Sequence, residues 1–404
     1  MKILVQKFGG TSVKDKESRQ HALTHVRDAI DEGYKVVVVV SAIGRYPEPY
    51  ATDSLLELVE YPNQHISKRE QDLLLSCGEI ISSVVFSNEL NQKGINSLAM
   101  TGAQAGFVTT DDFTEAKIKS MKVERLITEL HNLDVIVVAG FQGQTELGET
   151  TTIGRGGSDT SAAALGAALN ASYVDIFTDV NGIMTADPRV VSSAKTLDVI
   201  TYAEICNMAY QGAKVIHPRA VEIAMQADVP IRVRATREKG TGTLVTTSRD
   251  ETKGNDVPDR LITGIAHMEN ITQLKIDSEE DMNYLQSHIF KAMAEASISV
   301  DFINISPGGV VYTVADLLAD KAVSLLNDLN LKPVVKKNCA KVSLVGAGMT
   351  GVPGVTAKIV KTLSDANIPI LQSADSHTTI WVLIEEQYLM TAMNALHEAF
   401  DLNL

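Results

Sequence analysis

The chain has 404 residues, of which 45% are hydrophobic and 21% charged, and its formal net charge at neutral pH is −14. This length exceeds what one hydrophobic core normally organises, so we expect two or three domains with the composition of a soluble globular protein. The acidic balance argues against a nucleic-acid partner, because acidic residues do not neutralise a phosphate backbone. The first apolar run is too short for a signal peptide, and the longest later one, residues 36–44, is too short for a membrane span. A cytoplasmic protein is expected.

The cysteines do not form a recognisable site. Cys77, Cys206 and Cys339 are odd in number, lie far apart and have no Cys-x-x-Cys spacing. The sequence therefore supports neither a disulfide framework nor a zinc site, and the thiols are expected to be core residues.

The N-terminal segment predicts a phosphate-binding turn. Residues 3–8 have the composition of a buried strand, residues 9–12 form a turn with two glycines, and a helix is expected over 15–32. Lys7 stands at the carboxyl end of the strand, where open α/β sheets bind their ligands. The turn matches neither the P-loop nor the dinucleotide fingerprint, although a lysine and a double glycine can cradle a polyphosphate.

The following segments predict alternating strands and helices. We expect strands over 36–42, 97–100, 135–139 and 174–179, and helices over 73–90 and 117–130. Such a succession predicts an α/β fold with an open, mainly parallel sheet sandwiched by helices. The strand that contains Ser41 leads into a loop with two prolines, residues 44–53, which is expected to pass over the ligand-binding edge.

A glycine-rich turn followed by an alanine-rich helix, residues 150–169, is the strongest signal in the chain. Its glycines are Gly154, Gly156 and Gly157, and its candidate helix caps are Ser158, Asp159, Thr160 and Ser161. A helix that begins in such a turn presents free N–H groups and a positive dipole end, which bind anions. Arg155 adds donors suited to a carboxylate or phosphate. The alternative is an ordinary glycine turn before a capped helix, without a ligand. We favour the anion site because a second phosphate-type turn stands at Lys7.

Two further residues belong to polar turns. Lys214 follows the glycine turn 210–213, and His217 precedes Pro218. Because His217 has no visible partner, we interpret it as a structural or surface histidine and not as a ligand.

Together these motifs resemble the amino-acid kinase family. The matching segments are Lys7-Phe-Gly-Gly-Thr-Ser12, Gly154-Arg-Gly-Gly-Ser-Asp159, Thr178-Asp-Val-Asn-Gly182 and Ala186-Asp-Pro-Arg189. Within that family the order of motifs is similar to that of the aspartate kinases. Residues 46–50, 68–79 and 210–214 further resemble the monofunctional Bacillus-type branch.

The resemblance implies roles for individual residues. Catalytic roles are implied for Lys7, Asp159 and Lys214. Contacts to aspartate are implied for Ser41, Thr52, Glu79, Arg155 and Ser158. Contacts to ATP are implied for Lys7, Gly9, Gly10, Gly156, Gly157, Thr178, Asp179, Met184, Asp187, Arg189, Lys214 and Val215. Relatives often carry tyrosine where Met184 stands, so the adenine contact there departs from the family pattern.

The implied reaction is phosphorylation of a carboxylate. The side chain of free aspartate, whose pKa is ordinarily about 3.9, is already ionised at neutral pH, so no general base is needed. Catalysis should rest on positioning and on neutralising charge between two anions. Mg²⁺ is expected to arrive bound to ATP, with no ligands from the protein.

The C-terminal third contains an internal repeat. Shifting the chain by 70 positions aligns Ile289 with Ile359, Ile298 with Ile368, and Ser306 with Ser376. The pattern predicts two βαββαβ units, which resemble ACT domains. We place a catalytic domain at 1–245, a linker at 246–259, and the units at 260–338 and 339–404; whether the units are sequential or exchange strands stays open. Effector contacts are implied for Met282, Asn283, Ser299, Asp301 and Ser306.

One segment imitates a dinucleotide site. Residues 345–351 follow a strand, precede a helix and match the Gly-x-Gly-x-x-Gly pattern, with Asp375 near the end of the next strand. Too few residues follow to complete a doubly wound domain, and Pro353 fits the first turn of the helix. We interpret the segment as an ACT turn and not as a nicotinamide site.

The sequence thus predicts an ATP-dependent aspartate kinase that is inhibited by an end product and forms a homodimer, with no nucleic-acid or membrane partner. A kinase acting on glutamate or another carboxylate and a non-catalytic amino-acid sensor are the alternatives. The Bacillus-type resemblance implies meso-diaminopimelate as the effector, with lysine and threonine left open.

Overall fold

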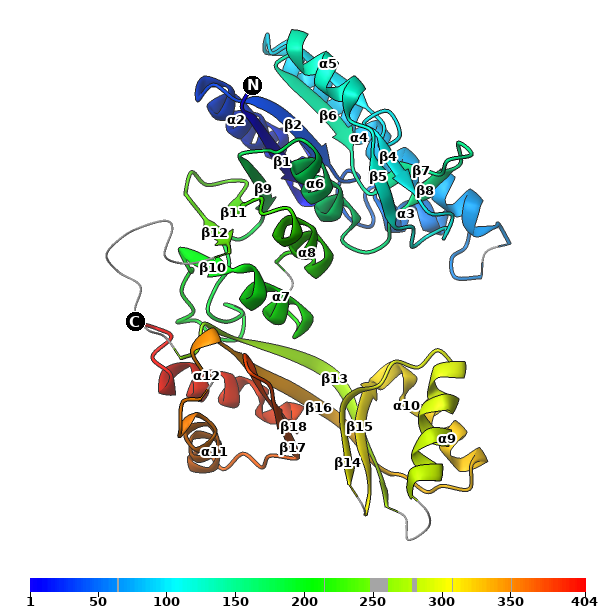
Figure 1. The fold of residues 1–404 in the computed structure, drawn as a ribbon, viewed down its shortest axis with the longest axis vertical. Coiled ribbons are helices and arrows are strands. Elements are labelled where there is room, and N and C mark those ends of the chain that lie inside the picture. The colour runs from blue at the N-terminus through cyan, green and yellow to red at the C-terminus, as the bar shows by residue number, and fades with distance from the viewer. Residues whose placement is uncertain (64, 214, 248–260, 278–281, 307, 350) are drawn as a thin grey trace. The chain divides into compact units, whose positions relative to one another are not determined.

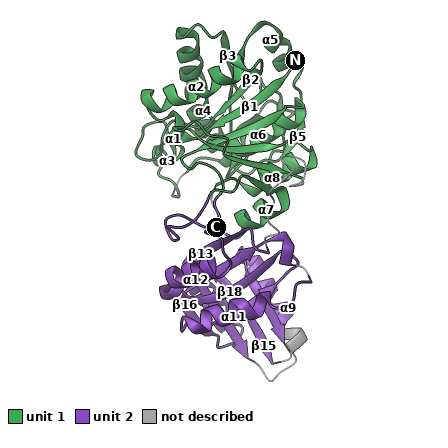
Figure 2. Cartoon of the chain, turned by 90° about the vertical axis from the view of Figure 1, so that its left-hand side faces the viewer, with its two compact units in different colours: residues 1–183, 196–209, 214–257 green, residues 184–195, 210–213, 258–404 purple. Residues whose placement is uncertain are grey.

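The computed structural model describes the chain except residues 64, 214, 248–260, 278–281, 307 and 350, and of residues 282–285 it describes the backbone only. The chain divides into two compact units (Figure 2). The first unit comprises Met1–Ile183, Thr196–Ala209 and Lys214–Val257, and the second comprises Met184–Lys195, Tyr210–Ala213 and Pro258–Leu404.

The first unit is built on an eight-stranded sheet of order β10-β12-β11-β9-β1-β2-β6-β3 (Figure 1). Its strands are β1 (Ile3–Phe8), β2 (Lys35–Val40), β3 (Ser97–Met100), β6 (Val135–Ala139), β9 (Tyr173–Thr178), β10 (Val199–Thr201), β11 (Ile231–Ala235) and β12 (Thr243–Thr246). All neighbouring pairs are parallel except β11 and β12. The predicted open, mainly parallel sheet is confirmed.

Helices cover both faces of this sheet. They are α1 (Gly10–Val13), α2 (Lys16–Asp31), α3 (Thr52–Glu57), α4 (Lys68–Gln92), α5 (Glu124–Asn132), α6 (Gly157–Ala168), α7 (Tyr202–Tyr210) and α8 (Pro218–Gln226). On one face, α2 and α4 bury side chains such as Leu23 and Phe86 against Leu4 and Phe8 of β1. Because side chains alternate along a strand, Gln6 shares the face of Leu4 and Phe8, whereas Lys7 lies on the opposite face. On that opposite side, α6 packs against β1 and β9, with α8 beside α6.

The prediction of one helix over residues 117–130 is wrong at its start. Residues Ile118–Met121 form strand β5, which pairs antiparallel with β4 (Phe107–Thr109), and the helix α5 begins only at Glu124. These strands join β7 (Gln142–Gln144) and β8 (Thr150–Thr152) in a separate four-stranded sheet of order β5-β4-β7-β8. The backbone pairing with β4 overrides the helical propensity of the sequence. The short helix α1 (Gly10–Val13) likewise occupies most of the turn predicted at residues 9–12.

Helix α4 is long and apolar enough in length and composition to cross a membrane, but 56% of its most apolar window is buried inside the fold. It packs against β3, β6 and β8. A helix with this burial is a core helix of the first unit.

The second unit contains a six-stranded sheet of order β14-β15-β13-β16-β18-β17. Its strands are β13 (Gly264–Asp277), β14 (Asp301–Ser306), β15 (Gly309–Ala315), β16 (Val334–Val345), β17 (Gln372–Asp375) and β18 (Thr379–Glu385), and its helices are α9 (Met282–Glu295), α10 (Asp316–Asp328), α11 (Val355–Asp365) and α12 (Leu389–Ala399). All paired strands are antiparallel. The long strands β13 and β16 pair with each other and run through both repeats, as Figure 1 shows. The repeats therefore share strands, and the predicted division at 338 falls within β16.

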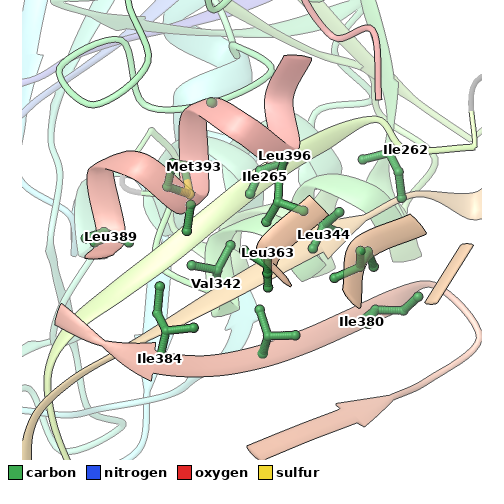
Figure 3. Packing of buried hydrophobic residues seen from close by; sticks show 14 of the residues in the cluster. Ile262, Ile265, Val342, Leu344, Leu363, Ile380, Ile384, Leu389, Met393 and Leu396 are labelled. Atoms are coloured by element: carbon green, nitrogen blue, oxygen red, sulfur yellow. The ribbon is translucent and has the colours of Figure 1, made fainter. Parts of the chain in front are cut away.

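The repeat predicted from the sequence has the same structural positions in both copies. Ile289 and Ile359 are 0% exposed, and each belongs to the core of its own repeat. Ser297 and Asn367, which are also 70 positions apart, both have a φ of 57°. Figure 3 shows the core of the second copy, where Val342 and Leu344 of β16 pack with Met393 and Leu396 of α12.

The segment Met184–Lys195 is part of the second unit. Ala186 and Val191 are buried in the core shown in Figure 3, and the Thr185 hydroxyl lies 2.9 Å from Nε2 of the buried His397. The side-chain amide of Asn394 donates to the Val190 carbonyl at 3.0 Å. Long-range packing thus places this segment with α12, which its sequence does not indicate.

The segment that imitates a dinucleotide site is a turn of the second unit. It contains the short 3₁₀ helix Ala347–Met349, and α11 begins at Val355 with Gly354 as its N-cap. Pro353 therefore precedes the cap and does not occupy the first turn of the helix, which corrects that part of the prediction. Thr350 lies outside the described residues.

Candidate active site

A cavity of about 440 Å³ opens in the first unit where strands β1, β2 and β6 end. It brings together predicted residues from distant parts of the sequence, namely Lys7, Ser41, Thr52, Glu79, Arg155, Gly156, Gly157, Ser158 and Asp159. It is also lined by Gly154 of the predicted glycine turn and by residues that sequence reasoning did not select, namely Asp53, Gln71, Leu75, Thr114, Phe141 and Thr152. The carboxyl end of a parallel sheet is the expected place for a ligand.

Lys7 and Asp159 form the central ion pair of this cavity. Nζ of Lys7 lies 2.7 Å from Oδ1 of Asp159, and both side chains are 13% exposed. The backbone N–H of His217 donates to Oδ2 of Asp159 at 3.3 Å. Lys7 comes from β1 and Asp159 from the first turn of α6. The pair therefore joins both predicted phosphate-binding turns.

The glycine turn before α6 has the backbone that only glycine adopts easily. Gly156 is left-handed with a φ of 66°, and a Cβ there would lie 2.1 Å from the ring of His217. Gly156 is itself the N-cap of α6, with no side-chain capping hydrogen bond. The prediction that one of residues 158–161 caps this helix is thus wrong, because α6 already begins at Gly157 and those residues lie within it. Free N–H groups and the positive helix end still face the turn.

Glu79 is buried with half of its carboxylate unpaired. The side chain is 2% exposed. Oε1 accepts a hydrogen bond from the Ala42 N–H at 3.0 Å, whereas the buried Oε2 has no hydrogen-bond partner among the described residues. Burial raises the pKa of Glu79 to about 8. A buried acid with a free oxygen is a site for a cationic group, which would restore its ionised form.

Asp72 holds together two segments of the cavity wall, and the sequence analysis did not select it. It is fully buried and accepts hydrogen bonds from the Thr114 N–H at 2.9 Å, the Thr152 N–H at 2.9 Å and the Thr152 hydroxyl at 2.6 Å. Burial raises its pKa, although these hydrogen bonds oppose the shift. Asp72 and Glu79 stand seven residues apart on α4, which places both on one helix face. That spacing was the available signal.

Two cationic side chains serve the cavity in different ways. Arg155 is exposed and lines the cavity. Arg219 instead donates to the carbonyl oxygens of Ile153 at 2.8 Å and Ala116 at 3.2 Å, which holds the strand before the glycine turn. His217 caps α8 by accepting at Nδ1 from the Arg219 N–H at 3.4 Å, in agreement with its interpretation as a structural residue.

Other predicted nucleotide residues do not line this cavity. The Gly10 carbonyl accepts from the Gly44 N–H at 3.1 Å, and a Cβ at Gly10 would lie 2.5 Å from the Gly44 oxygen. Gly9 precedes it as the N-cap of α1. The Thr178 hydroxyl donates to Oδ1 of Asp179 at 3.0 Å. Val215 is half-buried in the first unit, and Lys214 lies outside the described residues.

The predicted nucleotide residues Met184, Asp187 and Arg189 belong to the second unit. Arg189 binds the Asp187 carboxylate through two hydrogen bonds, with Nε 3.0 Å from Oδ1 and Nη2 2.6 Å from Oδ2. These hydrogen bonds lower the pKa of Asp187. Met184 is half-buried.

The predicted effector residues are distributed along the second unit. Ser299, Asp301 and Ser306 are exposed in or next to the edge strand β14. Oδ2 of Asp301 pairs with the buried Lys341, and the Ser306 hydroxyl donates to the Gly309 carbonyl at 3.1 Å. The side chains of Met282 and Asn283 lie outside the described residues.

Comparison with known proteins agrees with this geometry. Residues 2–235 match the amino acid kinase family, and residues 334–398 match the ACT domain. The chain is 64% identical over 403 residues to aspartokinase 1 of Bacillus subtilis, with 100% of both chains covered.

Solved structures with the same architecture include E. coli aspartokinase III in complex with aspartate and ADP, at a TM-score of 0.78 and 29% identity, covering 98% of this chain and 99% of the other. The same enzyme with lysine and aspartate matches at a TM-score of 0.77 and 30% identity, with the same coverage. The chain therefore belongs to the aspartokinases of the amino acid kinase family.

Proposed function

We propose that the cavity at Lys7 binds aspartate and transfers the γ-phosphoryl group of ATP to its side-chain carboxylate. The observation that carries this proposal is one cavity holding two complementary sites. The unpaired Oε2 of Glu79 suits an ammonium group, while Lys7 and the start of α6 suit anions.

The residues around the cavity suit the parts of aspartate. Glu79 receives the ammonium group, and its carboxyl group loses its proton as that cation binds. Arg155 binds a carboxylate of the substrate, and Ser41, Thr52 and Ser158 add hydroxyl groups from the cavity wall. In this arrangement the reacting carboxylate faces the glycine turn.

Charge neutralisation is the main catalytic task. Lys7, held by Asp159 at 2.7 Å, and the N–H groups at the start of α6 would stabilise the phosphoryl group during in-line transfer. Mg²⁺ would arrive bound to ATP and neutralise phosphate charge, and Asp53 in the cavity wall offers the oxygen chemistry that Mg²⁺ prefers. Leu75 and Phe141 exclude water from the acyl phosphate product.

The nucleotide contacts are part of the same proposal. Gly9, Gly10, Gly156 and Gly157 hold phosphates, and Thr178, Asp179 and Val215 line the nucleoside side in the first unit. For Lys214, Met184, Asp187 and Arg189 a contact to ATP is proposed on the family resemblance alone. The domain limits 1–245, 260–338 and 339–404, a cytoplasmic location and a homodimer remain proposals.

Regulation by an amino acid at the ACT repeats also belongs to this proposal. The E. coli relative was solved with lysine in a T-state and with aspartate and ADP in an R-state. For this chain we propose meso-diaminopimelate as the effector, bound by Ser299, Asp301, Ser306 and the segment that begins at Met282 and Asn283.

The test is acyl-phosphate formation from ATP, trapped with hydroxylamine, with aspartate and glutamate as separate substrates. Turnover of aspartate alone, suppressed by one of diaminopimelate, lysine or threonine, is the expected result. Turnover of glutamate alone would assign the chain to another carboxylate kinase. Effector binding without turnover of either substrate would make it a sensor.

A further inference from the structure

The first unit contains a second cavity, of about 460 Å³, on the face of the sheet that carries α2. It lies between β1, β9, β11 and α2, and none of its lining residues lines the cavity at Lys7. Gln6 and Lys7 are neighbours in β1, so the two cavities receive alternate side chains of one strand.

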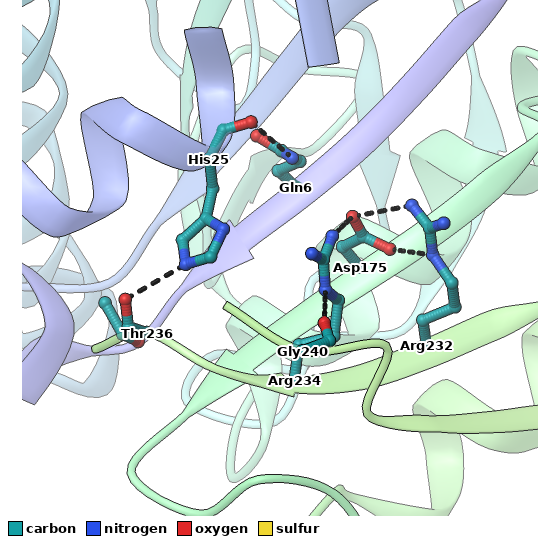
Figure 4. Close-up of polar contacts among 7 residues, drawn as sticks. All are labelled: Gln6, His25, Asp175, Arg232, Arg234, Thr236 and Gly240. Carbon is teal, nitrogen blue, oxygen red and sulfur yellow. Dashed lines mark hydrogen bonds and ion pairs between the residues drawn. The ribbon is translucent and has the colours of Figure 1, made fainter. Parts of the chain in front are cut away.

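Two arginines, Arg232 and Arg234, line this cavity, and Figure 4 shows their polar contacts. Asp175, which is fully buried, binds Nε of Arg232 at 2.6 Å and Nη2 of Arg232 at 2.9 Å, and it binds Nη1 of Arg234 at 3.1 Å. Nε of Arg234 donates to the Gly240 carbonyl at 3.1 Å. Within the part of the chain that the structure describes, Nη1 of Arg232 and Nη2 of Arg234 have no such partner. These hydrogen bonds thus hold both guanidinium groups in place, and each group still has an N–H donor available for a ligand.

A buried acceptor without a partner stands in the same wall. Gln6 is fully buried, and its Nε2 donates to the His25 carbonyl at 3.3 Å, but its Oε1 has no hydrogen-bond partner among the described residues. Gln6 and His25, labelled in Figure 4, line the same cavity as Arg234. An unpaired buried carbonyl is unfavourable because it has given up its hydrogen bonds to water, and a bound donor would recover that loss.

The charges around the cavity select the class of ligand. Arg232 and Arg234 are opposed by Asp175 and by the lining carboxylates of Asp28, Glu32 and Asp198, which still outnumber the cations although Lys239 pairs with Asp28 at 2.9 Å. Burial lowers the pKa of His25, so its ring is neutral at neutral pH. The cavity as a whole is therefore acidic, which disfavours a polyanion such as phosphate. It favours a ligand that offers a carboxylate to the arginines and a cationic donor to Gln6 and the acids.

We propose that this cavity is a second amino-acid site, which binds a zwitterionic or cationic α-amino acid. Its carboxylate binds the free N–H groups of Arg232 and Arg234, and its ammonium group donates to Oε1 of Gln6 with Asp198 and Glu32 nearby. The site is separate from the cavity at Lys7 and belongs wholly to the first unit.

Hydrogen bonds link this site to the phosphate-binding turn. Nε2 of His25 lies 3.0 Å from the Thr236 carbonyl oxygen, and the Thr236 hydroxyl lies 2.6 Å from that of Ser12 in α1. The Thr236 N–H also donates to the Thr178 carbonyl at 3.0 Å. A ligand against His25 is therefore expected to change the KM for ATP more than the KM for aspartate.

The test is calorimetric titration of the full chain with each proteinogenic amino acid and with diaminopimelate, in saturating aspartate and ADP. Gln6→Leu removes the unpaired carbonyl, together with the long hydrogen bond from Nε2 to the His25 carbonyl, and keeps a buried side chain of similar size, so the variant is expected to fold. We expect one amino acid whose affinity falls about tenfold in Gln6→Leu and severalfold in Asp198→Asn. Gln226→Leu, which changes an exposed glutamine of α8 outside the cavity, is the control and should leave the affinity unchanged.

Three outcomes would overturn the proposal. The first is that every amino acid binds Gln6→Leu as tightly as it binds the unmodified chain, which would place all binding elsewhere. The second is that no amino acid binds under these conditions. The third is that inorganic phosphate binds and that Asp198→Asn strengthens it, because removing a repelling carboxylate helps an anion and weakens a zwitterion.

Discussion

Glu79 and Asp175 are both buried carboxylates beside a cavity of the first unit, but they have different partners. Asp175 is bound by two arginines, whereas Glu79 has one backbone N–H and a free oxygen. The first is neutralised within the fold, so removing it would leave two cations without a counter-charge. The second has a pKa raised to about 8, so it is mostly protonated at neutral pH, and its ionised form lacks a cationic partner among the described residues. An unpaired buried acid thus indicates a ligand more strongly than a paired one does.

The largest effect is expected from Lys7→Met, which tests whether phosphoryl transfer occurs in the cavity of Glu79. Removing the cation held by Asp159 should lower kcat about 10³-fold, because it removes a charge that stabilises the transition state. Steady-state kinetics with ATP and aspartate measure this. Lys14→Met, at an exposed lysine near the same turn, should change kcat little. A kcat within a few-fold of the unmodified value for Lys7→Met would move the chemistry elsewhere.

Asp175→Asn tests the paired side of the comparison. It leaves Arg232 and Arg234 without their counter-charge, so the free energy of unfolding should fall by about 3 kcal/mol. Urea denaturation of the unliganded protein measures the loss. Asp134→Asn breaks the more exposed pair with Lys35 and should cost less than about 1 kcal/mol. Equal costs for the two variants would show that burial does not distinguish these pairs.

Glu79→Gln tests the unpaired side. The KM for aspartate should rise about tenfold or more, because the neutral amide loses the charge that attracts the ammonium group. In the unmodified chain this KM should fall as the pH rises from 6 to 9 and level off above the pKa of about 8, because the ammonium group requires the ionised form. In Glu79→Gln the KM should depend little on pH.

The same pKa has a consequence for stability. The folded value is raised from 4.5 to about 8, so between these values the folded state binds more protons than the unfolded state. The free energy of unfolding of the unliganded protein should therefore fall as the pH rises through this window. In Glu79→Gln, the melting temperature should fall less steeply as the pH rises through this window. An unchanged pH dependence would show that Glu79 is not its cause.

The smallest effect is expected from Ser12→Ala, which tests the link between the two cavities. The buried Ser12 and Thr236 hydroxyls lie 2.6 Å apart, and losing this hydrogen bond should cost about 1 kcal/mol of unfolding free energy and raise the KM for ATP a few-fold. Ser82→Ala is a matched control, because the buried Ser82 hydroxyl on α4 has no hydrogen-bond partner among the described residues. The link is absent if both variants behave alike.

The sequence predicts the parallel sheet and the main ligand-binding edge because buried strands and glycine turns have local signals. Lys7, Glu79 and Asp159 were expected together and line one cavity. Asp72 was missed because its partners Thr114 and Thr152 are 42 and 80 residues away. The strand Ile118–Met121 was missed because its pairing with β4 is a tertiary interaction.

Other features depend on packing that no local pattern shows. Gln6 looks like an ordinary polar residue of a strand, and only its burial without a partner for Oε1 marks it among the described residues. The segment around Ala186 and Val191 gives no sign in the sequence that it is buried with α12. The role proposed for Lys214 rests on the family resemblance, since that residue lies outside the described part of the chain.

The shared strands of the second unit limit how this protein can be divided. β13 and β16 each supply hydrogen bonds to both repeats, so a chain ending at residue 338 would cut β16 and leave β13 without much of its pairing. A truncated repeat would expose an unpaired strand edge, which favours aggregation. The two repeats are therefore expected to unfold in one cooperative transition. A destabilising change in either repeat would reach the other through the backbone, without any ligand.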